Sequence, residues 1–273
     1  EIGRRDWSSD VCSSDLAAVS ITAGIKGNAG ITVGNIVGSN ILNILIILGV
    51  TALITNVAIQ KTTFKYEIPY MLLITAVLLV MGMTGNEITF IEGVILWILF
   101  IAYLLYLYIL AKKGNDSGDE QSVKLYPVWK CLLFIVLGGV CVVIGSQLVV
   151  NGATTIARAC GMSERFIGLT IVAFGTSLPE LVTSVSAARK GNAGIAIGNI
   201  VGSNIFNILF VIGTVALICP VPFESRFVID TVVAILCGVL LWGGTIRHKE
   251  LRKPCGVVML LCYAAYFVYL AAM

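Results

Sequence analysis

Residues 26–50 read KGNAGITVGNIVGSNILNILIILGV and residues 190–214 read KGNAGIAIGNIVGSNIFNILFVIGT, so the chain contains one segment twice. At an offset of 164 (190 − 26), 18 of the 25 positions are identical. The identities include glycine, serine and asparagine, which are costly or weakly favoured in lipid, so shared hydrophobicity does not explain them. The offset is also too long for a solenoid repeat. The sequence therefore indicates a duplicated half.

The composition around these copies is typical of a membrane protein. Hydrophobic residues make up 58% of the chain and charged residues only 12%, against roughly 25% charged residues in soluble domains. A helix needs about 20 apolar residues to cross about 30 Å of hydrocarbon. We therefore predict an all-α membrane protein with a stub at 17–25 and eight complete transmembrane helices near 29–55, 68–85, 88–111, 129–155, 165–189, 193–219, 227–246 and 254–272.

The two copies have opposite orientations in this arrangement. Five predicted membrane crossings separate equivalent points of the two copies, and an odd number inverts the second copy relative to the first. An inverted-repeat bundle is typical of secondary transporters, which bind their substrate near the bilayer midplane where the repeats meet. Duplication kept for structural reasons alone is the alternative. It is less favoured because the identity is concentrated at polar residues.

The distribution of charge predicts the orientation of the chain. The net charge of +3 is too small to suggest a nucleic-acid partner. If the hydrophilic segment 112–128 is cytoplasmic, the inner loops hold twelve Lys and Arg residues and the outer loops four, with Arg4 and Arg5 set aside. This asymmetry agrees with the positive-inside rule. We predict a multi-pass plasma (inner) membrane protein with a cytoplasmic linker at 112–128, an external C-terminus, and halves at 17–111 and 129–273.

One acidic residue lies inside a predicted span. Residues 171–180 read IVAFGTSLPE, and Glu180 follows apolar sequence. A carboxylate inside the membrane is costly, so it usually binds a cation, forms a pair or relays a proton. Gly175 and Pro179 loosen the helix, which can free backbone carbonyls such as that of Ala173. On a helix, the positions three and four residues away share the face of the acid, and they are occupied by Thr176, Ser177, Thr183 and Ser184.

The duplicated segments supply further oxygen atoms. Polar residues are spaced four apart in each copy, namely Asn35, Ser39 and Asn43 in the first and Asn199, Ser203 and Asn207 in the second. Each stripe lies beside two glycines at the G-x-x-x-G spacing that allows close helix approach. Hydroxyl, amide, carbonyl and carboxylate oxygens without soft donors suit hard cations such as Ca²⁺. The stripe alone is a common helix-packing device, and the nearby carboxylate favours an ion site.

Other acidic residues receive structural interpretations. Asp230 lies four residues after Arg226 near a span end, and we interpret the two as a structural or interfacial pair. Glu67, Glu87 and Glu92 also lie near span ends, where we predict that they are solvated.

The motifs GTSLPE (175–180) and GNIVGSNIFN (198–207) resemble the second alpha-repeat of the sodium/calcium exchanger family, in the cation/calcium antiporter superfamily. The resemblance covers essentially residues 17–273, including 145–153 and 161–173, which are similar to bacterial members. It implies a fold of ten helices in two inverted five-helix halves. One span and part of a second would then be missing from this chain.

The resemblance also implies a cage of cation ligands built from both copies. Its members would be Glu180, Thr176, Ser177, Ser203, the carbonyl of Ala173, Ser39 and Asn43, with Asn207 at a position where some members have Asp. That difference leaves ion preference and potassium dependence open. The implied mechanism is alternating access, in which Ca²⁺ and Na⁺ compete for the cage and the Na⁺ gradient drives Ca²⁺ export across the lipid bilayer. No resident cofactor is implied, and the oligomeric state stays open.

The first sixteen residues depart from the repeat. The offset of 164 pairs Glu180 with Leu16, and residues 4–16 (RRDWSSDVCSSDL) resemble a translated sequencing adapter. We therefore expect residues 1–16 to be non-native. We also expect the intact gene to encode a second intramembrane Glu just before Ala17, and the chain as printed not to transport.

Three other functions compete with this one. A proton- or potassium-coupled exchanger of the same fold is hard to separate by sequence, and a cation channel is less favoured. An intramembrane serine protease needs a Ser-His or Ser-Lys pair inside the bilayer, but the single histidine, His248, lies in a charged loop. An aspartyl protease needs two intramembrane Asp residues, and only Asp230 comes close. We therefore predict that the protein is not an enzyme.

Overall fold

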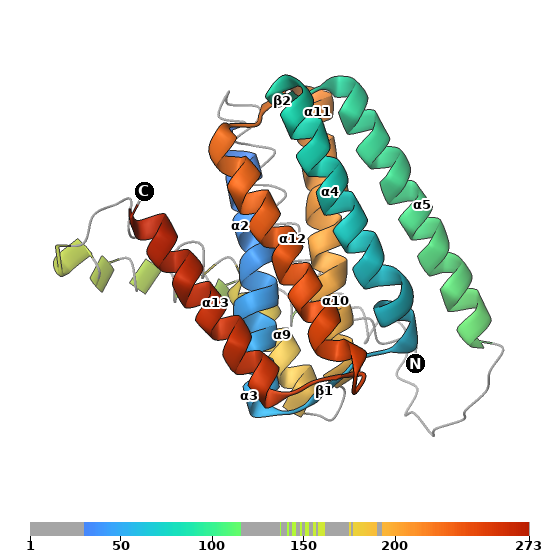
Figure 1. Ribbon diagram of the computed structural model, residues 1–273, viewed down its shortest axis with the longest axis vertical. Helices are drawn as coiled ribbons and strands as arrows, with labels where there is room; N and C mark the ends of the chain where they lie inside the picture. The colour runs from blue at the N-terminus through green and yellow to red at the C-terminus, as the bar shows by residue number, and fades with distance from the viewer. Residues whose placement is uncertain are drawn as a thin grey trace.

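The computed structural model describes residues 30–115, 175, 177–189 and 193–272, together with short pieces between 137 and 161. The described chain forms a bundle of long helices (Figure 1). Six described stretches are long and apolar enough to cross a membrane, and they confirm six of the eight predicted spans: Thr32–Ile54, Thr63–Gly85, Phe90–Leu110, Ala196–Ile218, Phe227–Ile246 and Lys253–Leu270. The stub 17–25 and most of the predicted span 129–155 lie outside the described residues, and the predicted span 165–189 is described only from residue 175 onward, without residue 176.

Each half contains one long span that is made of three consecutive helical pieces. The described first half consists of α2 (Gly30–Leu42), the π-helix η2 (Asn43–Leu48), α3 (Gly49–Ile54), the π-helix η3 (Thr63–Glu67), α4 (Ile68–Gly85) and α5 (Phe90–Asn115). The described second half consists of α9 (Leu178–Arg189), α10 (Ala193–Phe206), the π-helix η5 (Asn207–Ile212), α11 (Gly213–Ile218), α12 (Ser225–Ile246) and α13 (Lys253–Ala272). The offset of the repeat carries both bounds of η2 onto those of η5, and both bounds of α3 onto those of α11, so the repeat extends to individual turns.

Two antiparallel strand pairs join loops of one half to loops of the other. β1 (Val57–Ala58) pairs with β4 (Glu250–Leu251), and β2 (Glu87–Ile88) pairs with β3 (Val221–Pro222). The same offset maps β1 onto β3. β2 maps onto β4 at an offset of 163 (250 − 87), so the two pairs are equivalent with a shift of one residue. β1 lies at the end of the bundle near α3, and β2 lies at the opposite end near α11 (Figure 1). This placement is the geometry that an inverted repeat requires.

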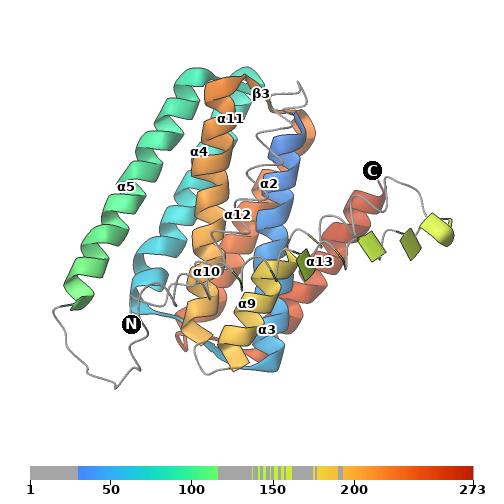
Figure 2. The ribbon, with the colours of Figure 1, turned by 180° about the vertical axis from the view of Figure 1, so that it is seen from behind.

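The two duplicated spans form the centre of the bundle. In an 18-residue stretch of Thr32–Ile54 and of Ala196–Ile218, 78% and 72% of the positions are buried, against 22% in such a stretch of Phe90–Leu110 and 11% in Lys253–Leu270. Figure 2 shows α5 along one edge of the bundle and α13 on the opposite side. These outer helices expose large apolar side chains, which suit contact with lipid. Polar side chains on the duplicated spans are thereby shielded.

One acidic residue contradicts the sequence prediction. Glu67 is buried in η3, with 3% of its surface exposed, and its Oε2 atom accepts a hydrogen bond from Thr63 Oγ1 at 3.0 Å. The reason is that the helix begins before residue 68, so Glu67 lies inside it and not in the preceding loop. Glu87 is exposed, as predicted. Glu92 is half-buried, and its Oε2 atom accepts hydrogen bonds from the backbone N and Oγ1 of Thr89 at 2.7 and 2.9 Å.

A different partner is found for Asp230. In α12, Oδ1 of Asp230 accepts a hydrogen bond from the hydroxyl of Tyr266 in α13 at 2.8 Å. The side chain of Arg226, the partner predicted from the sequence, lies outside the described residues. The predicted pair therefore stays a prediction, while the tyrosine links two helices of the second half.

Candidate cation site

Four asparagines join the two copies of the repeat where their long helices meet. Asn40 Nδ2 donates to the backbone O of Asn204 at 3.3 Å, and Asn204 Nδ2 donates to the backbone O of Asn40 at 3.1 Å. Asn43 Nδ2 donates to Asn204 Oδ1, and Asn207 Nδ2 donates to Asn40 Oδ1, both at 3.0 Å. Each bond has its counterpart in the other copy. At most 4% of any of these residues is exposed, so the contact is a buried and symmetrical polar network.

The network lies near the middle of the membrane spans. Asn43 is the central residue of Thr32–Ile54, and Asn207 is the central residue of Ala196–Ile218. Half of such a span corresponds to roughly 16 Å of helix. Both residues also begin π-helical segments, which occur frequently at functional sites.

Glu180 approaches this region on a third helix. It is 4% exposed and lies in the first turn of α9 (Leu178–Arg189), where the positive end of the helix dipole favours a carboxylate. Pro179 is tolerated there because the first turn has no N–H groups bonded within the helix. α9 contacts both α10 and η2. Glu180 therefore lies on the helix that packs against elements of both copies.

Polar contacts hold α9 beside α10. Thr183 Oγ1 donates to the carbonyl of Glu180 at 3.0 Å, and Asn199 Nδ2 donates to Thr183 Oγ1 at 3.4 Å. The hydroxyl of Thr183 is thus occupied inside the protein, although the sequence placed it on the polar face of Glu180.

Five buried oxygen atoms on or beside these helices have no hydrogen-bond partner within the part of the chain that the structure describes. They are Oδ1 of Asn43 and Asn207 and Oγ of Ser177, Ser184 and Ser203. Buried polar atoms in native proteins are almost always paired, and leaving one unpaired costs free energy. A hard cation coordinated by oxygen would supply the missing partner.

Most of the predicted ligands are buried in the described part of the chain. Six of the eight are described and all are buried: Ser39, Asn43, Ser177, Glu180, Ser203 and Asn207. Thr176 and Ala173 lie outside the described residues. The sequence reasoning assigned no role to Asn40 and Asn204, although their identity in the two copies was an available signal.

The glycines beside the polar stripes differ in how closely they are approached. A Cβ atom added at Gly34 would lie 2.9 Å from Cε1 of Phe227. At Gly198 it would lie 3.8 Å from Thr63 Oγ1, and at Gly38 it would meet nothing within 4 Å. The close approach predicted from the glycine spacing is therefore tight at Gly34 and looser at the other two.

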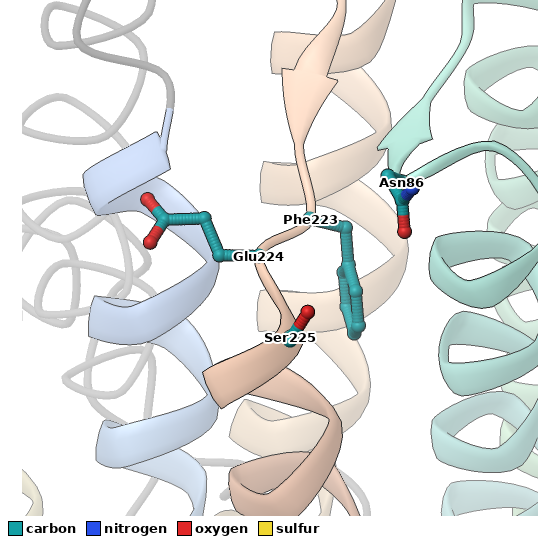
Figure 3. A pocket seen from close by; sticks show the side chains of 4 residues that line it. All are labelled: Asn86, Phe223, Glu224 and Ser225. Carbon is teal, nitrogen blue, oxygen red and sulfur yellow. The ribbon is translucent and has the colours of Figure 1, made fainter.

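A separate cleft lies at the end of the bundle where β2 and β3 pair. It is lined by Asn86, Phe223, Glu224 and Ser225 (Figure 3). The backbone N of Phe223 donates to the carbonyl of Asn86 at 2.7 Å, and Glu224 points away from the Phe223 ring. These four lining residues are all different from the predicted ligands, so we place the candidate cation site at the buried asparagines.

Comparisons with known proteins agree with a cation transporter. A family model described as sodium/calcium exchanger protein matches residues 13–109 and 130–272. The putative antiporter CaxA of Alkalimonas amylolytica is 36% identical over 258 residues, which cover 91% of this chain and 81% of that protein. The sodium/calcium exchanger MaX1 of Methanosarcina acetivorans is 32% identical over 293 residues, covering 93% of this chain and 83% of that protein.

A solved structure has the same fold. The sodium-calcium exchanger NCX_Mj, soaked with zero Na⁺ and Ca²⁺, superposes with a TM-score of 0.81 and 31% sequence identity. The match covers 97% of this chain and 85% of that structure.

Proposed function

This chain belongs to the sodium/calcium exchanger family, and we propose that it is a secondary active antiporter that exchanges Na⁺ for Ca²⁺ across a membrane. The observation that carries the proposal is that five buried oxygens have no partner in the described part of the chain. They lie on the two central spans and on or next to α9, the helix of Glu180. The oxygens of Asn43 and Asn207 lie at the middle of the two spans, which fits a binding site that opens to either side in turn.

We assign the ligands to both copies of the repeat. Glu180, Ser177, Ser203 and Asn207 come from the second half, and Ser39 and Asn43 come from the first. Thr176 and the carbonyl of Ala173 complete the proposed set. The carboxylate balances part of the charge of a divalent ion, and the neutral oxygens replace the water that the ion loses. The same neutral oxygens can hold Na⁺, so the two ions compete for one site.

We propose alternating access, and the way the two central spans are held supports it. Asn40, Asn43, Asn204 and Asn207 bond the two central spans to each other, which makes their crossing a fixed unit. We infer that access to the ion changes through movement of other elements past this crossing. We also propose that segment 112–128 is cytoplasmic, that the C-terminus is external, and that the plasma (inner) membrane is the location.

The test is Na⁺-driven uptake of labelled Ca²⁺ into proteoliposomes by a Glu180→Gln variant. Because the sequence predicts that residues 1–16 are not native, the assay compares the printed chain with a restored chain, in which the genomic sequence upstream of Ala17 replaces them. In the restored chain we expect Glu180→Gln to lower uptake by about 100-fold or more, since it removes charge but little volume. Glu87→Gln, which changes an exposed carboxylate, is the control and should leave uptake unchanged. Normal uptake by an inserted Glu180→Gln protein would move the site elsewhere.

The same vesicles separate the competing functions. An exchanger driven by Na⁺ loses uptake when the Na⁺ gradient is removed. Uptake driven by a pH gradient alone would support proton coupling, and a requirement for K⁺ on the Ca²⁺ side would support potassium coupling. Ca²⁺ flux without any counter-ion gradient would support a channel.

A further inference from the structure

The direction of each amide in the asparagine network is fixed by the backbone. The main-chain oxygens of Asn40 and Asn204 can only accept hydrogen bonds, so the side-chain group that faces each of them must be the Nδ2 amine. The observed distances of 3.1 and 3.3 Å agree with that assignment. A second N–H of Asn204 faces the sulfur of Met71 at 3.9 Å. Neither amide can turn over without placing oxygen against oxygen.

The orientation of these two amides also fixes the orientation of the amides of Asn43 and Asn207. Because Nδ2 of Asn204 faces a carbonyl, its Oδ1 is left to accept from Asn43 Nδ2 at 3.0 Å. In the same way, Oδ1 of Asn40 accepts from Asn207 Nδ2 at 3.0 Å. The amines of Asn43 and Asn207 are therefore committed to the network. Their Oδ1 atoms face away from it, and neither has a hydrogen-bond partner among the described residues.

We propose that Asn40 and Asn204 are positioning residues that make Asn43 and Asn207 present oxygen, and not an amine, to the transported cation. The proposal rests on the function proposed above. An amide that is free to rotate would offer its positively polarised N–H groups to the ion in some of its orientations. Each positioning residue acts on the ligand of the opposite copy, because Asn204 holds Asn43 and Asn40 holds Asn207.

A purely structural role for these residues makes a different prediction. If Asn204 only holds the two helices together, its loss affects the ligands of both copies alike. If it positions Asn43, its loss weakens Ca²⁺ binding only through Asn43. The pattern of coupling between variants therefore distinguishes the two roles.

The experiment is a pair of double-mutant cycles in the restored chain. Asn204→Leu is combined with Asn43→Ala, and separately with Asn207→Ala as the matched control. The half-saturating Ca²⁺ concentration and the maximal rate of Na⁺-driven uptake are measured for each protein, and thermal unfolding without Ca²⁺ reports the fold. Groups that orient metal ligands typically contribute about 10–100-fold to affinity.

We expect Asn204→Leu alone to raise the half-saturating Ca²⁺ concentration about tenfold. It should raise it again about tenfold when Asn207 is Ala, but less than about twofold when Asn43 is already Ala, since no amide then remains to be oriented. The Asn40→Leu cycle should give the reverse pattern, with coupling to Asn207 and not to Asn43. This second cycle is an independent test if Asn204→Leu fails to fold.

Equal factors in both backgrounds would overturn the proposal, as would a lower maximal rate with no change in half-saturation. Failure of both Leu variants to fold without Ca²⁺ would make the network structural and would also overturn it. Loss of uptake in Glu180→Gln together with additive cycles would leave the proposed function standing and reject only the positioning role.

Discussion

Gly34 and Gly198 occupy the same position in the two copies of the repeat, but their neighbours differ. An added Cβ atom would lie 2.9 Å from the ring of Phe227 at the first and 3.8 Å from the hydroxyl of Thr63 at the second. Thr63 and Phe227 are themselves equivalent under the offset of the repeat. Gly34 therefore contacts an aromatic ring, whereas its counterpart Gly198 faces a hydroxyl group.

The difference continues one turn further along each helix. Glu67 accepts a hydrogen bond from Thr63 at 3.0 Å, while Thr231 at the equivalent position donates to the carbonyl of Phe227 at 2.6 Å. The four buried asparagines keep identical partners in both halves. The two central spans therefore stay alike where they contact each other and differ where each packs against the next helix of the opposite half.

The halves should differ most in the loss of stability caused by adding a methyl group at Gly34 or at Gly198. Gly34→Ala forces the Cβ atom against the ring of Phe227, which is 5% exposed and has little room to move. Overpacking of this kind costs about 1–3 kcal/mol. Gly198→Ala has ordinary contact distances and should be neutral or slightly stabilising. Thermal unfolding in one detergent measures both variants, and equal losses would show that the two contacts are equivalent after all.

A smaller difference is expected from removing one hydroxyl in each half. Thr63→Val removes a hydrogen bond that the buried carboxyl of Glu67 accepts. With that group ionised, the change should lower the free energy of unfolding by about 1.5–3 kcal/mol. Thr231→Val removes a bond to a carbonyl within the same helix and should cost about 1 kcal/mol or less. The free energy of unfolding of the two Val variants is compared at one pH. A greater loss for Thr231→Val would contradict a stabilising role of Thr63 for Glu67.

The smallest effect is expected at a contact whose carboxylate has no counterpart in the first half. Tyr266→Phe removes the hydrogen bond to Asp230 Oδ1 and should cost about 1 kcal/mol. At the offset of 164, Asp230 corresponds to Tyr66, so the first half has no carboxylate at this place. Tyr269→Phe is the matched control, because Tyr269 stacks on Tyr266 at 6.3 Å between ring centroids and keeps that contact without its hydroxyl. Equal stability of Tyr266→Phe and the unmodified chain would remove the link between α12 and α13.

The sequence predicted the six described spans because each is an apolar run of sufficient length. It predicted Glu180, Ser203 and Asn207 as ligands because polar residues within such runs are costly and stand out. It assigned no role to Asn204, because only the crossing of the two backbones shows that this asparagine faces a carbonyl. Glu67 was misplaced because it lies directly before the predicted start of the span at residue 68, whereas helical structure begins before it. Nothing in the composition indicated the π-helices.

The strand pairs have a consequence for synthesis of the protein. Val57 pairs with Leu251 and Ile88 pairs with Val221, so each pair joins an early loop to one that is made much later. Because a chain leaves the ribosome from its N-terminus, the first half enters the membrane with two strand edges exposed, one on each side. Such edges can pair with other chains until their partners arrive. The last residues needed to cover them belong to the loop before α13, so an interruption of translation there leaves β1 open to pairing with another molecule.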